Sequence, residues 1–253
     1  MCSSDLYADA LLAALPSAPR IALVHATAYS DDHQVMRYLA RRLADKGAQP
    51  ILVSPAHVRW AEGRAQVVTQ WWHGAVDALV RFFPAEWLPN LPRETGWTHW
   101  FSGSRTAASN PAAALLTQSK RFPLVWDALE TALPTWRALL PETRDPRDAP
   151  WRGNDAWVLK PALGRVGDGI GLAGATPAKE WRKISRAVFW HPGHWVAQRR
   201  FAATPVTSGT EPFYPCVGVY TVDGRAAGAY GRLAGRPLID ARARDVAVLL
   251  ETA

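Results

Sequence analysis

Short apolar runs and one amphipathic stretch alternate in the first part of the chain. Arg20–Ala26 and Gln49–Ser54 are continuous apolar runs with the length of buried strands. The stretch between them repeats apolar residues at helical spacing, and the expected buried face carries Val35, Met36, Leu39 and Leu43. Ser30 or Asp31 is suited to the N-cap, and Gly47 ends the pattern. The order strand, helix, strand predicts a parallel, right-handed unit.

The pattern beyond this unit predicts where the chain divides. The segments AQVVTQ and VDALVRFF are expected to continue the α/β layer to about Phe83. Pro84–Ser109 is irregular, with Pro, Gly and Asn punctuation, and residues 111–133 regain helical spacing. The polar, proline-rich stretch 141–155 is expected to be a linker. We therefore expect a small α/β layer with an irregular connection over residues 7–108 and a nucleotide-binding part over residues 109–253.

Strand patterns dominate the remainder of the chain. A strand is expected at Ala156–Lys160, a helix near Ala178–Val188, and Asp223–Gly224 is a hairpin signal between two apolar runs. Further strands are expected around Trp195–Phe201, Tyr214–Val222 and Ala226–Arg232.

At the other end, MCSSDL is similar to a peptide translated from a sequencing adapter, so we expect residues 1–6 to be an artefact and the natural chain to be longer.

Composition narrows the class of protein. The chain of 253 residues is 48% hydrophobic and 20% charged, which is ordinary for a globular protein, and it has no apolar run long enough for a transmembrane helix. Its two cysteines, Cys2 and Cys216, cannot build a disulfide framework, so we expect a cytoplasmic protein without a membrane partner. The net charge of +7 favours an anionic partner, such as a nucleotide, an acidic metabolite or nucleic acid.

The stretch WVLKPALGRVGDGIGL carries the candidate chemistry. Lys160 ends the expected strand, and four glycines follow within eight residues, from Gly164 to Gly171. The order G-x-x-G-x-G differs from the dinucleotide fingerprint, and the lysine precedes the glycines, unlike in a Walker A loop. A strand ending in lysine, a glycine turn and a second strand at IGLAGA would let backbone N–H groups approach phosphate. On this stretch alone, an ordinary hairpin with a glycine-rich tip is the favoured explanation.

Four segments in order resemble one known family. LKPALGRVGDGI and GVYTVDGRAAGAYGRL resemble the glycine loop and the arginine-ended hairpin of the glutathionylspermidine synthase family of ATP-grasp ligases. VDALVRFFPAEWL and QSKRFPLVW are similar to two further segments, so the resemblance runs from about Arg20 to the C-terminus. Gly169 stands where the family usually has Asn, and Leu233 and Ala234 stand where Glu and Ser often follow the arginine.

The resemblance implies a fold and a set of site residues. The fold is α/β with α+β character: an ATP-grasp fold, truncated at the N-terminus and preceded by a small Rossmann-like layer. Lys120 and Lys160 would contact ATP, and the glycine loop after Lys160 would cover its phosphates. A hinge formed by Gln198 and Arg199 would hold adenine. Arg232 would be catalytic by stabilising the transferred phosphoryl group. The implied ATP-binding residues are Lys120, Lys160, Gly164, Arg165, Gly167, Gly169, Gln198 and Arg199. The family's Mg²⁺ ligands lie on strands that match no segment here, so no metal ligand is assigned.

The activity implied is that of an ATP-dependent, amide-forming C–N ligase. It would act through an acyl phosphate on a glutathione-like peptide acid and a polyamine or another amine. Because charge neutralisation by metal ions contributes strongly to phosphoryl transfer, we expect this chain alone to be a poor ligase. Two alternatives stay open: a nucleotide-binding module without catalysis, and a basic nucleic-acid binder, although core packing accounts for the 13 tryptophans better than base stacking does.

Overall fold

The computed structural model describes residues 3–165 and 167–249, with side chains except at Ser3, Ser4 and Ser208. Residue contacts divide it into two compact units. The first unit comprises the described residues up to Leu115 together with Tyr220–Gly228, and the second comprises Leu116–Val219 together with the described residues from Ala229 onward. The division expected from the sequence lies a few residues earlier, at 108/109. Each unit is described by itself below.

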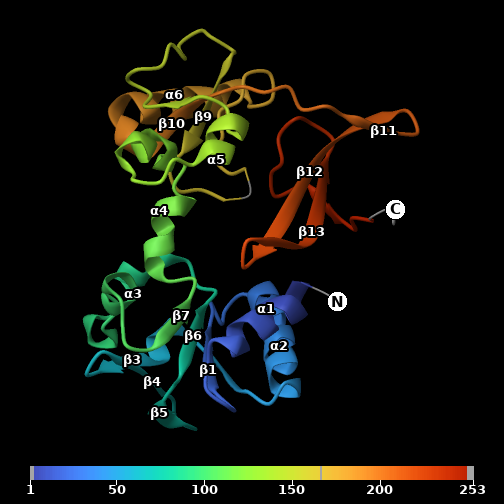
Figure 1. Ribbon diagram of the computed structural model, residues 1–253. Coiled ribbons are helices and arrows are strands. Elements are labelled where there is room, and N and C mark those ends of the chain that lie inside the picture. The colour runs from blue at the N-terminus through green and yellow to red at the C-terminus, as the bar shows by residue number, and fades with distance from the viewer. Residues whose placement is uncertain (1–2, 166, 250–253) are drawn as a thin grey trace. The chain divides into compact units, whose positions relative to one another are not determined.

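The first unit is built on a parallel sheet of order β2-β1-β6-β7, beside a separate antiparallel sheet of order β3-β4-β5 (Figure 1). Its strands are β1 (Arg20–Val24), β2 (Gln49–Val53), β3 (Val58–Ala61), β4 (Arg64–Val68), β5 (His73–Ala75), β6 (Ala78–Arg81) and β7 (Ala107–Ser109). Its α-helices are α1 (Ser3–Ala13), α2 (Ser30–Asp45) and α3 (His99–Ser102). Short 3₁₀ helices span Pro55–His57, Ala85–Asn90, Arg93–Thr95 and Ala112–Ala114.

After the exposed Arg20 at its start, strand β1 is apolar and buried because both faces of the parallel sheet are covered. Ile21 and Leu23 pack into the core beneath α1 and α2. Ala22 and Val24 point the other way, into a core shared with the β3-β4-β5 sheet. Successive side chains of a strand point to opposite faces, so a continuous apolar run is what a strand between two cores requires. The α/β fold class expected from the sequence is confirmed.

The predicted strand–helix–strand unit is confirmed as β1-α2-β2, with parallel pairing from Arg20↔Gln49 to Val24↔Val53. Two details of α2 were wrong. Val35 is 49% exposed, because the buried stripe is centred on Met36, Leu39, Ala40 and Leu43 and Val35 lies at its edge. The N-cap is Tyr29, with no side-chain capping bond, rather than Ser30 or Asp31.

The segment AQVVTQ, which was expected to continue the α/β layer, does not join its parallel sheet. This segment forms β4, which pairs antiparallel with β3 and β5. Its place is set by the turn before it, where Glu62 and Gly63 have φ values of +52° and +74°. Two successive residues with positive φ form the turn that matches the twist of a tight hairpin, so the chain reverses at once instead of crossing over.

The remaining elements form two further sheets, of order β8-β10-β9 and β11-β12-β13-β14. The strands are β8 (Thr143–Arg144), β9 (Trp157–Pro161), β10 (Trp195–Arg199), β11 (Val206–Ser208), β12 (Glu211–Val222), β13 (Arg225–Ala234) and β14 (Arg244–Val246). The helices are α4 (Leu115–Gln118), α5 (Pro134–Leu139) and α6 (Ala178–Trp190), with 3₁₀ helices at Phe122–Ala128 and Pro192–His194. The predicted hairpin turn at Asp223–Gly224 is confirmed by its φ values of +49° and +75°.

The strand predicted at IGLAGA is absent from the described structure, where one antiparallel bridge, Leu159↔Gly171, takes its place. Thr176 explains the difference. Its hydroxyl donates to the carbonyl of Ile170 and accepts from the N–H of Leu172, at 2.9 Å in both cases. These bonds hold the backbone in a turn, because a threonine hydroxyl can compete with a strand ladder for backbone groups.

The stretch expected as a linker, 141–155, contributes β8, which pairs with β10. It also carries Asp145, whose carboxylate forms an ion pair with Arg121 at 2.8 Å. The core of the second unit lies against α6 and includes Trp157 and Leu159 of β9, Ala197 of β10, and Ile184 and Val188 of α6.

Candidate functional site

The candidate site lies on the face of the β8-β10-β9 sheet that is turned away from α6. Trp157 and Leu159 occupy the core against α6, so Val158 and Lys160 project from the opposite face. Gln198 of β10 is the register partner of Val158, and it therefore shares this face with Lys160.

A short hydrogen-bond chain crosses this face from strand to strand. The Lys160 ammonium donates to Gln198 Oε1 at 2.5 Å, and Gln198 Nε2 donates to Thr143 Oγ1 at 2.8 Å. Gln198 is buried, at 8% exposure. Because both ends of its amide are engaged, Gln198 has a fixed orientation and holds the lysine in place.

A second lysine is attached to the start of the glycine loop. The backbone N–H of Lys120 donates to the Ala162 carbonyl at 2.9 Å, and its ammonium donates to the Gly164 carbonyl at 2.8 Å. Both lysines therefore have neutral oxygen partners. No carboxylate of residues 3–165 or 167–249 forms an ion pair with either ammonium.

The two lysines line the same cavity, and their ammonium groups interact electrostatically. Burial lowers the pKa of Lys120 below its usual 10.5. Burial also lowers the pKa of Lys160, and the positive charge of Lys120 lowers it further. Two desolvated like charges with neutral partners destabilise the protein until an anion joins them, so this face is suited to binding a phosphate or carboxylate.

Two cavities of the second unit meet at Lys160 and Gln198. The first, of about 550 Å³, also includes Lys120, and its walls are mostly apolar. These walls include Phe122, Pro123, Trp126, Leu133, Trp136 and Leu140. The second, of about 640 Å³, extends along the end of β10 through Arg199–Ala203 and is also lined by Tyr214 and Leu238. Both volumes fall in the range of small-molecule sites.

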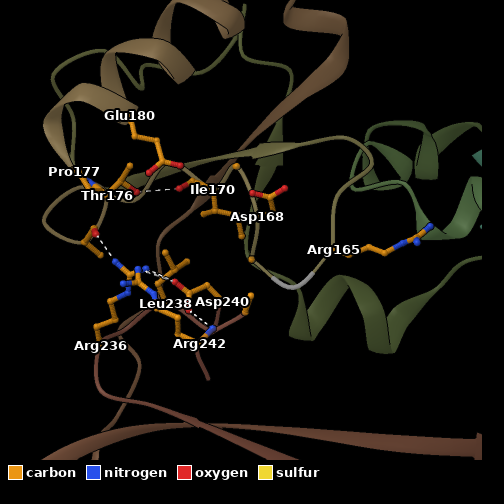
Figure 2. A pocket seen from close by; sticks show the side chains of 14 residues that line it. Arg165, Asp168, Ile170, Thr176, Pro177, Glu180, Arg236, Leu238, Asp240 and Arg242 are labelled. Atoms are coloured by element: carbon orange, nitrogen blue, oxygen red, sulfur yellow. Dashed lines mark hydrogen bonds and ion pairs between the residues drawn. The ribbon is translucent and has the colours of Figure 1, made fainter. Parts of the chain in front are cut away.

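The glycine loop borders a third cavity, of about 350 Å³, which Figure 2 shows from close by. Gly167 has φ +69°, and a Cβ there would lie 2.1 Å from the Ile239 carbonyl oxygen, so only glycine fits. Across this cavity Arg236 and Arg242 converge on Asp240, while Arg165 points away from them (Figure 2). The hydrogen bond from Arg236 is the main cause that lowers the pKa of Asp240 to about 2.

The structure brings together some of the predicted site residues and separates others. Lys120, Lys160 and Gln198 surround one cavity, and Gly164 accepts the Lys120 ammonium. The side chain of Arg199 projects to the other face, where it pairs with Glu142 and lies over the Trp157 ring. The other predicted residues, Arg165, Gly167 and Gly169, line the third cavity.

Arg232, the predicted catalytic residue, lies on β13 with its guanidinium engaged. It forms an ion pair with Asp245 at 3.1 Å and donates to the carbonyls of Asp240 and Ala243. It therefore holds the segment that leads to β14, which also lines the third cavity through Asp240.

Sequence reasoning missed two parts of the site. Thr143, which orients Gln198, lay in the stretch assigned to a linker. The apolar wall formed by Trp126, Trp136 and Leu140 was attributed to core packing. No short stretch of the sequence marks this wall, because it takes shape only where these residues meet Lys160 and Gln198.

Residues 3–165 and 167–249 contain no group of three or more His, Cys, Asp or Glu side chains that could hold a metal ion. Over the same ranges, no helix combines the length and the apolar character needed to span a bilayer.

Comparison with known proteins identifies relatives. Residues 7–251 match the family model described as glutathionylspermidine synthase preATP-grasp. No curated protein matches the sequence.

Among solved structures, a glutathione synthetase-like effector from Globodera pallida aligns with a TM-score of 0.54 at 10% identity, covering 91% of this chain. The present chain spans 58% of the length of that protein. D-cycloserine synthetase aligns with a TM-score of 0.49 at 15% identity, covering 84% of this chain and 67% of its own. At 10% identity, the likeness to the effector concerns the fold alone.

Proposed function

Because the chain belongs to the glutathionylspermidine synthase preATP-grasp family, we propose that Lys160 and Lys120 bind the phosphates of ATP and that the protein activates a small-molecule acid for amide formation. One observation carries the proposal. Two partly desolvated ammonium groups with neutral partners line one cavity, and one of the two lysines, Lys160, also lines the neighbouring cavity. An anion such as a nucleotide phosphate supplies the charge that this arrangement lacks.

The 640 Å³ cavity is the proposed place for adenine. It runs along Arg199–Ala203, and Val158, Leu172 and Leu238 give it apolar walls suited to a flat ring. The N–H groups of Arg199 and Arg200 already donate to the carbonyls of Glu142 and Ala156. We therefore assign the adenine contacts to the backbone just beyond them, at 201–203.

The reaction proposed has two balanced steps. A carboxylate oxygen of the acid attacks the γ-phosphorus of ATP, the bond to the β–γ bridging oxygen breaks, and ADP leaves. A primary amine then attacks the carbonyl of the acyl phosphate, phosphate leaves, and the amine nitrogen loses a proton. Lys160 and Lys120 would balance negative charge on the phosphates, which accelerates transfer because their ammonium groups are already in place.

Small-molecule acid and amine substrates are part of the proposal, as is a cytoplasmic location, which the scarcity of cysteine supports.

The other predicted residues enter the proposal with limits. Arg232 could act on the phosphoryl group only after exchanging Asp245 for phosphate, because its guanidinium holds Asp245 and two carbonyls. ATP-grasp chemistry implies Mg²⁺, but the described residues offer no cluster of acidic side chains that fits the ion. We derive no step through it.

The substitution Lys160→Gln tests the nucleotide site. It removes the charge but keeps a side chain of similar length, and we expect MgATP to bind about 10- to 100-fold more weakly, since a hydrogen bond to a charged group contributes about 1.5–3 kcal/mol. The matched control is Lys179→Gln, at an exposed lysine of α6 that lines neither site cavity. Isothermal titration calorimetry measures both variants against the unmodified chain.

Two results would contradict the proposal. Equal loss of affinity in both variants would mean that the nucleotide is attracted by net charge alone. Tight MgATP binding without ATP consumption, across a panel of acids and amines, would leave a binding module without ligase activity.

A further inference from the structure

The 550 Å³ cavity contains more apolar surface than a nucleotide phosphate or a peptide acid requires. One end carries the ammonium groups of Lys120 and Lys160, whose partners are neutral oxygens. The rest is bordered by Phe122, Trp126, Leu133, Trp136, Leu140 and other apolar side chains. A cavity that is cationic at one end and aromatic along its walls matches a ligand with the complementary division, namely an anionic head and an apolar body.

Two further observations indicate that this cavity serves a ligand. Trp126 is only 8% exposed, and its indole N–H is buried without a hydrogen-bond partner among the described residues. Leu133 adopts left-handed backbone angles, φ +50° and ψ +45°, although it is not glycine. An unpaired buried donor and a strained backbone are both unfavourable for stability, and proteins retain such features mainly at functional sites.

The cavity is open at one side. Trp136 is 59% exposed while it also lines the cavity, so its ring lies at the boundary with solvent. Leu129, on the same boundary, is 38% exposed. A ligand can therefore enter beside Trp136 and place its anionic end at the lysines.

We propose that this cavity binds the acid substrate, and that this acid is an aromatic or branched aliphatic carboxylate rather than a glutathione-like peptide. The inference rests on the proposed function, because it takes the neighbouring cavity as the nucleotide site. Lys160 and Gln198 line both cavities, so a carboxylate held at Lys160 lies beside the nucleotide phosphates. A polycation such as spermidine is repelled by the two ammonium groups, and a charged tripeptide would leave its polar groups unpaired against the apolar walls.

The first test measures binding directly, with the full chain and no turnover. By isothermal titration calorimetry, 3-phenylpropanoate is expected to bind with 1:1 stoichiometry. The neutral analogue 3-phenylpropanamide is expected to bind at least about tenfold more weakly, because the contact with the ammonium groups is lost. Glutathione and spermidine are titrated under the same conditions. Binding of glutathione as tightly as the phenyl acid overturns the proposal.

The substitution Leu140→Trp locates the site. Leu140 lines the cavity, so a larger side chain there fills part of its volume and is expected to weaken 3-phenylpropanoate binding at least about tenfold. The matched control is Leu139→Trp, at the adjacent residue, which is 74% exposed and does not line the cavity. Unchanged acid binding in Leu140→Trp overturns the proposal.

A second measurement needs no cavity variant and applies even where Leu140→Trp does not fold. With 5-fluorotryptophan incorporated throughout, the ¹⁹F signals of Trp126 and Trp136 are expected to shift on addition of the acid. The signal of Trp190, which is 72% exposed on α6, is expected not to shift. Shifts confined to tryptophans outside the cavity overturn the assignment.

A parallel MgATP titration separates the two proposals. If MgATP binds but the acid does not, the acid site is wrong and the nucleotide site stands. If the acid binds but MgATP does not, the proposed function is wrong, and the role of the acid as a ligase substrate is wrong with it. Binding of both, with only the acid sensitive to Leu140→Trp, supports both proposals.

Discussion

At the scale of single residues, Asp145 connects parts of the second unit that are far apart in sequence. Its carboxylate accepts from Arg121 at 2.8 Å and from the side chain and backbone N–H of Arg147. Arg121 in turn donates to the carbonyl of Trp195, at the start of β10. These hydrogen bonds, led by those from Arg147, hold the pKa of Asp145 far below its usual 3.8. Asp145 thus helps to fix the sheet that carries Lys160 and Gln198.

We expect Asp145→Asn to lower the free energy of unfolding at neutral pH by about 2 kcal/mol, because two guanidinium groups lose their charged acceptor. The pKa of Asp145 is lower in the folded than in the unfolded chain, so its contribution is present above about pH 4 and is lost as the pH falls below that value. Urea denaturation at neutral pH and in acid checks this expectation, and the difference between variant and unmodified chain should shrink in acid.

The control for that experiment is Asp127→Asn. Asp127 also pairs with an arginine, Arg137, but its side chain is 95% exposed. Exposed ion pairs contribute little, so its substitution is expected to change stability by less than about 0.5 kcal/mol. An equal effect at both positions would show that burial and the second arginine add nothing at Asp145.

At the scale of elements, the sequence predicted those whose pattern is local. The strand–helix–strand unit and the Asp223–Gly224 hairpin followed from periodicity and turn residues, both of which are properties of short stretches. The exposure of Val35 and the turn after the glycine loop could not be derived from periodicity or turn residues. The first depends on where the stripe of α2 meets the sheet, and the second on the Thr176 hydroxyl.

Helix α2 offers a direct test of its corrected orientation. Leu43 is fully buried, so Leu43→Ala is expected to lower the free energy of unfolding by about 3 kcal/mol through lost contacts and a cavity. Val35→Ala, at a position once expected on the buried face, is expected to cost less than about 0.5 kcal/mol. Chemical denaturation measures both variants. A large effect of Val35→Ala would mean that Val35 lies on the buried face of α2, as the sequence predicted.

At the scale of the whole molecule, the family and the α/β class could be predicted, and part of the site could too. Lys160, Lys120 and Gln198 were expected together and line one cavity. The apolar wall could not be anticipated, because Trp126 and Trp136 line one cavity with Lys160 and Gln198, which come from strands distant in sequence. The side chain of Arg199 lies on the face opposite to that of Gln198 because successive residues of a strand alternate between the two faces of the sheet.

Lys160 and Gln198 border two cavities at once, and this has a thermodynamic consequence. An anion bound on one side uses part of the positive charge that an anion on the other side needs, so nucleotide and acid should weaken each other's binding before any chemistry occurs. Because such coupling is reciprocal, MgATP should raise the Kd of the acid by the same factor by which the acid raises the Kd of MgATP. Titrating each ligand in the presence of the other measures this factor, and a factor of one would mean that the two ligands do not compete for the charge of Lys160. An enzyme built in this way would favour filling one cavity at a time at low ligand concentration, and only an excess of both substrates would bring them together at Lys160.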